Sequence, residues 1–286
     1  MTAAVRPLGT LQRIVIVAKK TSASHGGTGQ TPSDRQFVTA LARGLSVLRC
    51  FDAQHPQLGT TEIAQMTKLP QPTVWRLCHT LQQLGYLLQS PDNSDKLRIG
   101  MAVLGLGQSA LSSTEIAEMA YPEMTHIAKV SRVAVSLGVK DQNDVLIIKR
   151  AQGEGPLLVN LTVGSRLPIA TSSAGWAYLA ALPEDAREEA LRGAKHQYQG
   201  KWATLRGAIE TATQKYHSTG FVLSEGFYHP NVTSVAAAAL DRAGRPLYVV
   251  NCGGPNLKPK VLREELGPMI AQLANKITTA LAGRSL

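Results

Sequence analysis

The chain has little cysteine and no long apolar run, and both shortages narrow what it can be. Its 286 residues include three cysteines, Cys50, Cys78 and Cys252, with no CxxC spacing. A sparse, odd set of cysteines favours reduced thiols in a cytosol over a disulfide framework or a zinc site. No stretch approaches the ~18 apolar residues of a membrane span, and residues 14–18 (IVIVA) are too short for a secretory signal. We therefore expect a soluble, cytoplasmic protein with no membrane contact.

Motifs for metals, phosphates and covalent catalysis are also missing. His229 has neither HxH nor HxxE spacing to a second ligand. Gly253 and Gly254 are not followed by the GK[ST] of a phosphate loop. Cys252 has no evident histidine to activate it, which favours a buried strand thiol over a nucleophile. We expect no cofactor, no metal and no catalytic residue.

The charge is basic but dispersed. The formal net charge is +10 and the pI is near 9.7, a balance that favours polyanionic partners such as nucleic acid. Residues 36–113, however, hold six basic against four acidic side chains, a net charge of +2. Charge alone therefore does not indicate DNA binding.

Residues 60–88 have the pattern of a helix, a tight turn and a second helix. Thr60 or Thr61 can cap the first helix, and Glu62 lies early in it, where the helix dipole favours an acid. Pro72 suits the first position of the second helix. The buried stripe of that helix is expected at Val74, Leu77, Leu81 and Leu84. This arrangement is typical of a helix-turn-helix, which lays its second helix in the DNA major groove.

The opposite face of the second helix holds side chains that suit DNA. Glutamine can bind adenine through two hydrogen bonds, threonine can contact a thymine methyl group, and arginine can contact a base or a phosphate. An alternative for Trp75 and Arg76 is that they only cover a following hairpin. The predicted DNA-binding residues are Gln71, Thr73, Trp75, Arg76 and His79.

The segments before and after the helix-turn-helix are predicted to form a tail, a further helix, a hairpin and a linker helix. Residues 1–35 are polar and basic, so we expect a flexible tail. Residues 37–51 have apolar side chains at helical spacing on one face. Short strands are predicted at 86–89 and 97–99, giving a winged helix-turn-helix over residues 36–100. A helix over 101–119 would link this domain to the next.

From residue 121 the pattern becomes mixed α and β. Strands are predicted at 133–140, 145–151, 157–163, 221–224, 234–241 and 247–252, and helices at 173–181, 205–217 and 261–281. Short turn-forming segments between neighbouring strands indicate hairpins and hence a largely antiparallel sheet. We expect an α+β protein whose second domain covers residues 121–286.

Residues 164–180 (GSRLPIATSSAGWAYLA) lead into a helix near Ser173 through small side chains. The N–H groups of Ser173, Ala174 and Gly175 could bind an anion at this helix start. An ordinary capped helix explains the same residues, so this segment alone does not decide between the two.

Taken together, these segments resemble the IclR family of bacterial transcriptional regulators. The matching stretches are ARGLSVLRCF, TEIAQMTKLPQPTVWRL, LGYL, the G-x-R-L-P-x-x-x-T-S-S-A-G segment and TGFVLSEGF with VTSVAAAALDRAGRPLYVV. They run over residues 37–281. The resemblance implies a winged helix-turn-helix, a linker helix and a C-terminal effector domain of GAF-like α/β fold. It also implies operator DNA as partner, dimers or dimers of dimers, and a small organic acid, in some members an aromatic one, as effector.

The resemblance also implies an effector pocket. Its residues would be Ser173, Ala174, Gly175, Ser224, Ser234, Asn251 and Gly253, with apolar walls from Leu157, Val159 and Leu167. Trp176 lies where the family usually has lysine, and Ser224 where an acidic residue is common. Ser234 lies where some members have cysteine. These departures favour an aromatic or bulky carboxylate, unless Trp176 instead faces the core or a dimer contact.

Two other classes of protein remain possible from the sequence. An enzyme with a vestigial helix-turn-helix would need an activated nucleophile or an acid–base pair in the pocket. A purely architectural DNA binder would not need a second domain with a polar-lined pocket. The sequence favours a ligand-responsive regulator over both.

Overall fold

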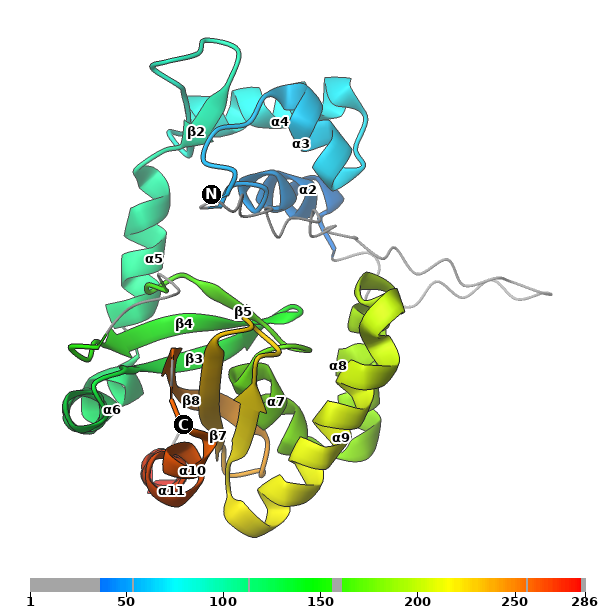
Figure 1. The fold of residues 1–286 in the computed structure, drawn as a ribbon. Coiled ribbons are helices and arrows are strands. Elements are labelled where there is room, and N and C mark those ends of the chain that lie inside the picture. The colour runs from blue at the N-terminus through cyan, green and yellow to red at the C-terminus, as the bar shows by residue number, and fades with distance from the viewer. Residues whose placement is uncertain (1–36, 53, 113, 156–160, 256, 284–286) are drawn as a thin grey trace, which may run out of the picture. The chain divides into compact units, whose positions relative to one another are not determined.

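The computed structural model describes residues 37–52, 54–112, 114–155, 161–255 and 257–283 (Figure 1). They form two compact units, divided along the chain between residues 111 and 112. Each unit has its own hydrophobic core. The tail expected over residues 1–35 lies outside the described residues.

The first unit is a helix-turn-helix followed by a small hairpin. Its elements are α2 (Thr39–Leu48), α3 (Thr60–Thr67), α4 (Gln71–Gln83) and the antiparallel strands β1 (Leu87–Gln89) and β2 (Leu97–Ile99). Val47, Ile63, Val74 and Leu87, one from each of the helices and from β1, are fully buried together. The winged helix-turn-helix predicted from the sequence is confirmed.

The buried side of α4 differs in part from the predicted stripe. Val74 is buried and Leu77 and Leu81 are half-buried, but Leu84 is exposed. Cys78 takes the second fully buried position of the helix. Leu84 is the C-cap residue that follows the last residue of α4, so the periodicity of the helix no longer decides where its side chain lies.

The start of α3 also differs from the prediction, because Gly59 rather than Thr60 or Thr61 precedes its first residue as the cap. Glu62 completes this cap, and its Oε2 accepts a hydrogen bond of 2.7 Å from the Gly59 N–H. That bond, with Lys96 at 3.5 Å, holds the pKa of Glu62 below its usual range. The charged carboxylate therefore stabilises this helix start.

This cap predicts a pH-dependent contribution to stability. A carboxyl group with a lowered folded pKa stabilises the fold above its unfolded pKa, and the effect is lost as the pH falls through the folded value. We expect Glu62→Ala to lower the free energy of unfolding of the first unit by about 1 kcal/mol at pH 7 and by less at pH 3. Amide hydrogen exchange in α3 and α4 at both pH values measures this. Asp92→Ala, an exposed acid of the wing, is the control, and equal effects of the two variants would contradict the prediction.

The helix predicted over residues 101–119 is two helices. α5 (Ala102–Ser112) is followed by α6 (Glu115–Ser131), and Thr114 is the N-cap of α6. α6 then continues beyond the predicted end and supplies Ile116, Met124 and Ile127 to the core of the second unit.

The second unit is built on a six-stranded antiparallel sheet, as predicted. Its strands are β3 (Ala134–Asp141), β4 (Asp144–Ala151), β5 (Arg166–Pro168), β6 (Val222–Glu225), β7 (Val232–Leu240) and β8 (Pro246–Pro255), in the order β5-β4-β3-β8-β7-β6. The β3–β4 pair shifts register between Leu137 and Gly138. The strand predicted at 157–163 is absent from its described part, residues 161–163, and the edge strand lies at β5 instead.

Helices cover both faces of this sheet (Figure 1). One face packs against α6 and the C-terminal helices α10 (Pro259–Val261) and α11 (Gly267–Gly283), which are joined by a π-helical segment, Leu262–Leu266. The other face packs against α7 (Ser173–Ala180), with α8 (Glu184–Gln197), the short 3-10 helix Gln199–Lys201 and α9 (Trp202–Thr219) around it. Within the described residues, no helix combines the length and apolar character needed to cross a membrane.

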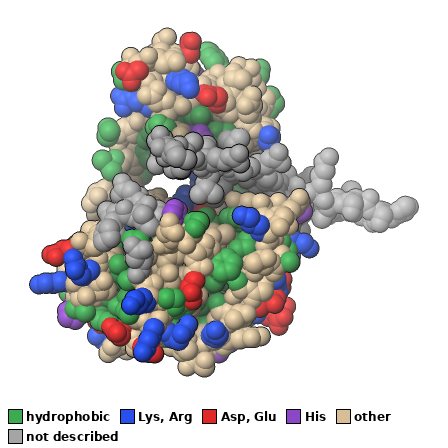
Figure 2. Space-filling view, in the orientation of Figure 1, with side chains coloured by type: hydrophobic (Ala, Val, Ile, Leu, Met, Phe, Trp, Pro, Cys, Tyr) green, Lys and Arg blue, Asp and Glu red, His purple; other side chains and the backbone are tan. Residues whose placement is uncertain are grey.

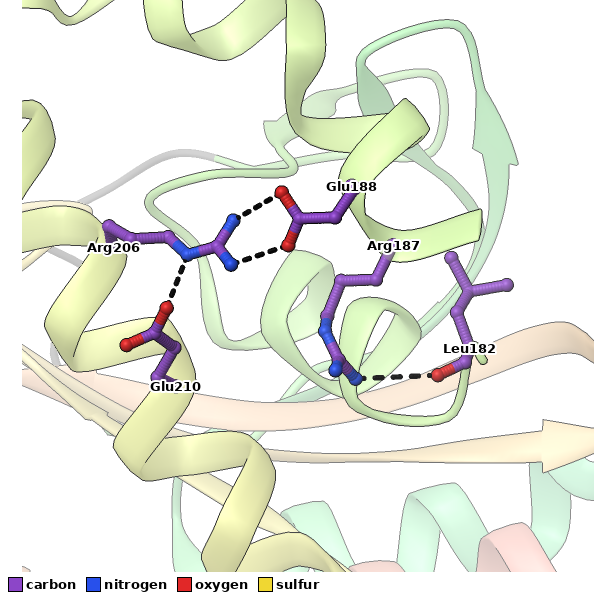
Figure 3. A network of polar contacts seen from close by, with 5 residues as sticks. All are labelled: Leu182, Arg187, Glu188, Arg206 and Glu210. Atoms are coloured by element: carbon purple, nitrogen blue, oxygen red, sulfur yellow. Dashed lines mark hydrogen bonds and ion pairs between the residues drawn. The ribbon is translucent and has the colours of Figure 1, made fainter. Parts of the chain in front are cut away.

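The outer helices α8 and α9 are joined by a polar network, shown in Figure 3. The Arg206 guanidinium donates to both carboxylate oxygens of Glu188 and to Glu210. The hydrogen bond from Arg206 holds the pKa of Glu188 below its usual range. Arg187 donates to the Leu182 carbonyl instead. Because the acids are well exposed, such pairs stabilise the fold only slightly.

Candidate functional site

The exposed face of α4 presents the side chains predicted to contact DNA. Gln71, Trp75, Arg76 and His79 are exposed, and Thr73 is half-buried. Gln71 is the first residue of the helix, the end that enters the groove in helix-turn-helix proteins. Four of the five predicted residues are therefore accessible on α4, and Thr73 lies at the edge of this exposed face.

Local contacts order part of this surface. Gln71 Nε2 donates to Thr61 Oγ1 at 3.0 Å, which fixes the amide against α3. The Trp75 and His79 rings stack with centroids 5.5 Å apart and planes 3° apart. Trp75 is 59% exposed, so it does not serve as a buried cover for the hairpin. In the described part of the chain, Arg76 has no acidic partner.

Charge on the molecule is dispersed. On the face shown in Figure 2, Lys and Arg side chains are interspersed with Asp and Glu. Arg76 is the only Lys or Arg in α4, so this helix offers specific groups rather than a concentrated positive field.

The second unit contains a pocket at the start of α7. It lies on the sheet face that carries α7, where β3, β4, β7 and β8 contribute residues. Its lining residues are Val133, Ala134, Arg150, Gln152, Gly155, Leu161, Leu167, Ser172, Ser173, Tyr228, Val232, Ser234, Asn251, Gly253, Gly254 and Pro255. Within that described lining there is no Asp or Glu.

Ser172 organises the start of α7. Its hydroxyl donates to the Pro168 carbonyl at 2.7 Å and accepts from the Gly175 N–H at 3.0 Å. A side chain at Gly175 would collide with Ile169, whose carbonyl oxygen lies 2.2 Å from the Cβ position. The predicted set of three N–H donors therefore needs correction, since the Gly175 N–H is already bonded. The N–H groups of Ser173 and Ala174 have no partner within the described residues.

Several predicted polar residues meet in this pocket. Ser173 and Ser234 are 2% and 7% exposed, respectively. Their hydroxyls, like the Asn251 amide, have no hydrogen-bond partner in the described structure. Gly253 leaves no room for a side chain, because a Cβ there would lie 2.4 Å from Ser234 Cβ. Hydroxyl and amide groups that line a pocket and lack protein partners favour a polar ligand.

The other predicted pocket residues are placed differently. Ala174, Gly175 and Ser224 are buried but do not line the pocket. Ser224 lies opposite Ser234 in the β6–β7 pair. Leu167 lines the pocket, whereas Leu157 and Val159 lie outside the described residues.

Arg150 is a pocket residue that the sequence did not reveal. It lies opposite Ser136 on β3, and Ser136 lies opposite Asn251 on β8. Arg150 Nη1 donates to Ser136 Oγ at 3.0 Å. Burial lowers the pKa of Arg150, but a guanidinium keeps its charge in proteins. The pocket therefore holds a fixed positive charge.

Trp176 belongs to the core rather than to the pocket. It is 2% exposed, its Nε1 donates to the Ala170 carbonyl at 2.7 Å, and its ring lies 4.9 Å from that of Phe227. Of the two alternatives for this residue, core packing is the one observed. The aromatic side chain that does line the pocket is Tyr228, which the sequence did not indicate.

The cysteine thiols are unreactive, and the possible metal ligands are not clustered among the described residues. All three cysteines are buried, and burial raises the pKa of Cys50 and Cys78 to about 11 and that of Cys252 to about 12. These thiols stay protonated near neutral pH. Among the described residues, no three His, Cys, Asp or Glu side chains are grouped to hold a metal ion.

Comparison with known proteins assigns both units of the chain to one family. A family model described as "IclR helix-turn-helix domain" matches residues 40–91, and one described as "Bacterial transcriptional regulator IclR C-terminal" matches residues 108–279. The chain is 32% identical over 245 residues to the HTH-type transcriptional regulator TsaQ1/TsaQ2 of Comamonas testosteroni, covering 84% of this chain and 87% of that protein.

Solved structures agree with the fold. An IclR family transcriptional regulator from Brucella abortus matches with a TM-score of 0.80 and 38% identity, over 87% of this chain and 94% of that one. An IclR homolog from Microbacterium hydrocarbonoxydans, solved in complex with 4-hydroxybenzoate, matches with a TM-score of 0.65 and 22% identity, over 85% and 98% of the two chains.

Proposed function

The chain belongs to the IclR family of bacterial transcriptional regulators, and from that premise we propose that a small carboxylate in the pocket at the start of α7 modulates its binding to operator DNA. The family is one of DNA-binding regulators with an effector domain and not of enzymes.

One observation carries the proposal. The pocket contains hydrogen-bond donors that have no partner, namely the hydroxyl and N–H of Ser173 and the side-chain amide of Asn251. The described residues of its lining include no Asp or Glu. The start of a helix favours negative charge through its free N–H groups and its dipole. A carboxylate can accept hydrogen bonds from these donors, whereas a cation would be repelled by the positive charge of Arg150.

The body of the effector is expected to be apolar. Leu161, Leu167 and Val133 line the pocket together with the Tyr228 ring. The relative from Microbacterium hydrocarbonoxydans was solved with an aromatic carboxylate, 4-hydroxybenzoate. An aromatic or branched acid fits such a lining, in which a few polar groups orient an otherwise apolar ligand.

We propose that Gln71, Thr73, Trp75, Arg76 and His79 contact the operator, and that the protein acts as a homodimer or a dimer of dimers. Two α4 helices must then match the spacing of two half-sites. An effector that binds one arrangement of the protomers better than another shifts operator affinity. We infer that α5 and α6, which join the two units along the chain, transmit this change.

A mobility-shift titration tests the proposal. The full chain is titrated against its own promoter region and against random DNA, with and without benzoate, 4-hydroxybenzoate and short aliphatic acids. We expect preferential binding to the promoter and a change of several-fold in apparent affinity with at least one acid. Specific binding that no acid alters would contradict the effector, and binding no stronger than to random DNA would contradict operator recognition.

A further inference from the structure

Arg150 is the one charged side chain among the described residues that line the pocket. Its guanidinium has five N–H groups, of which the structure uses one, to Ser136. No acidic side chain pairs with it in the described part of the chain. A partly buried cation without a counter-charge is costly to the fold, so its presence here points to an anionic group that arrives with the ligand.

The two donor groups of the pocket lie on different sides of it. Arg150 lies on β4, whereas Ser234, which lines the pocket with Ser173, lies on β7. In the order β4-β3-β8-β7, this is a separation of three strands, or roughly 15 Å between backbones. The donors of the pocket are therefore spread over several strands, and a ligand with two anionic groups can engage both Arg150 and the donors near Ser173.

We infer that the effector has two anionic groups, one held by the start of α7 and a second held by Arg150. This inference rests on the proposed function, since it presumes a carboxylate in this pocket. Leu161 and Leu167 line the pocket together with these donors, which suits an apolar spacer. The ligand class is then a dicarboxylate, or a carboxylate with a second oxyanion, on a short aliphatic or aromatic body.

A purely structural role for Arg150 would be to hold Ser136. Ser136 Oγ is the acceptor of the Arg150 bond that the structure records, so Ser136→Ala removes that bond and leaves the charge. Arg150→Gln removes the charge and keeps a hydrogen-bond donor. Arg150→Lys keeps the charge but loses the planar, two-pronged geometry. The three variants separate charge from local packing.

Isothermal titration calorimetry on the full chain provides the test. The probes are the straight-chain dicarboxylates from succinate to suberate, each against the monocarboxylate of equal chain length, and the three benzenedicarboxylates against benzoate. For at least one pair we expect the wild-type protein to bind the diacid roughly 10- to 100-fold more tightly, as for a charge-assisted contact. Arg150→Gln should abolish this preference, because it should weaken binding of the diacid by a larger factor than binding of the monoacid.

Two further variants distinguish the charge of Arg150 from its hydrogen bond to Ser136. Ser136→Ala should keep the preference, and Arg150→Lys should keep part of it. If every monoacid binds as tightly as its diacid, or if Arg150→Gln weakens both members of a pair equally, the inference is overturned while a carboxylate effector still stands. If no acid binds at all, the proposed effector fails and the inference fails with it. Should Arg150→Gln not fold by circular dichroism, Arg150→Lys and the wild-type ligand pairs decide.

Discussion

Replacement of Trp176 by alanine is expected to destabilise the second unit by about 3–5 kcal/mol, the range for removing a large buried aromatic side chain. The variant loses the packing of the indole beneath α7, its contact with Phe227 and its hydrogen bond to the Ala170 carbonyl. It also leaves that buried carbonyl without its donor, which adds to the cost. Urea denaturation of the full chain, followed by circular dichroism, measures the loss.

The chain supplies a matched control at Trp75. That side chain is 59% exposed in the first unit, so Trp75→Ala should change the free energy of unfolding by less than about 0.5 kcal/mol. A small effect at Trp176 comparable to that at Trp75 would mean that α7 does not depend on the indole. The position of α7, and with it the set of residues that line the pocket, would then be wrong, because the start of α7 forms one side of the pocket.

Replacement of Arg76 by alanine is expected to weaken operator binding by about 1–3 kcal/mol, or roughly 10- to 100-fold, while effector binding is unchanged. Arg76 is exposed on α4 beside the Trp75–His79 stack. If it contacts a phosphate, the loss will be similar for all DNA sequences and the salt dependence will become shallower. If it contacts a base, the loss will be confined to the operator.

Fluorescence anisotropy with promoter and random DNA at several salt concentrations distinguishes these outcomes. Lys215→Ala, an exposed residue of α9, removes the same charge from the other unit and should leave DNA affinity nearly unchanged. Equal losses in the two variants would reduce the role of Arg76 to net charge. Loss of effector binding in Arg76→Ala would contradict the division between a DNA-binding and an effector-binding unit.

Much of the fold was predictable because periodicity and turn residues are local signals. The two helices around the turn at Lys68–Pro70, and strands such as β3 and β4, lie within a residue or two of their predicted positions. Apolar spacing did not decide which faces are buried. Leu41 and Leu45 have helical spacing, yet they are exposed on α2, while Val47 enters the core.

The pocket was predictable only in part, and Arg150 shows why. Strict alternation along β4 from Ile147, which packs under α7, would put Arg150 on the opposite face of the sheet. The register shift between β3 and β4 inserts one extra residue, so Ala151 faces the opposite core and Arg150 enters the pocket. A bulge depends on pairing between distant strands, and the sequence of one strand does not show it.

The burial of all three cysteines has a practical consequence. Because Cys50, Cys78 and Cys252 are shielded and protonated, maleimide reagents should react slowly with the wild-type chain. A single cysteine introduced at an exposed position of α4, such as Thr80, could then be labelled without removing the native thiols. Spin or fluorescence labels placed there would report the separation of recognition helices in an assembled regulator, with and without effector, in solution.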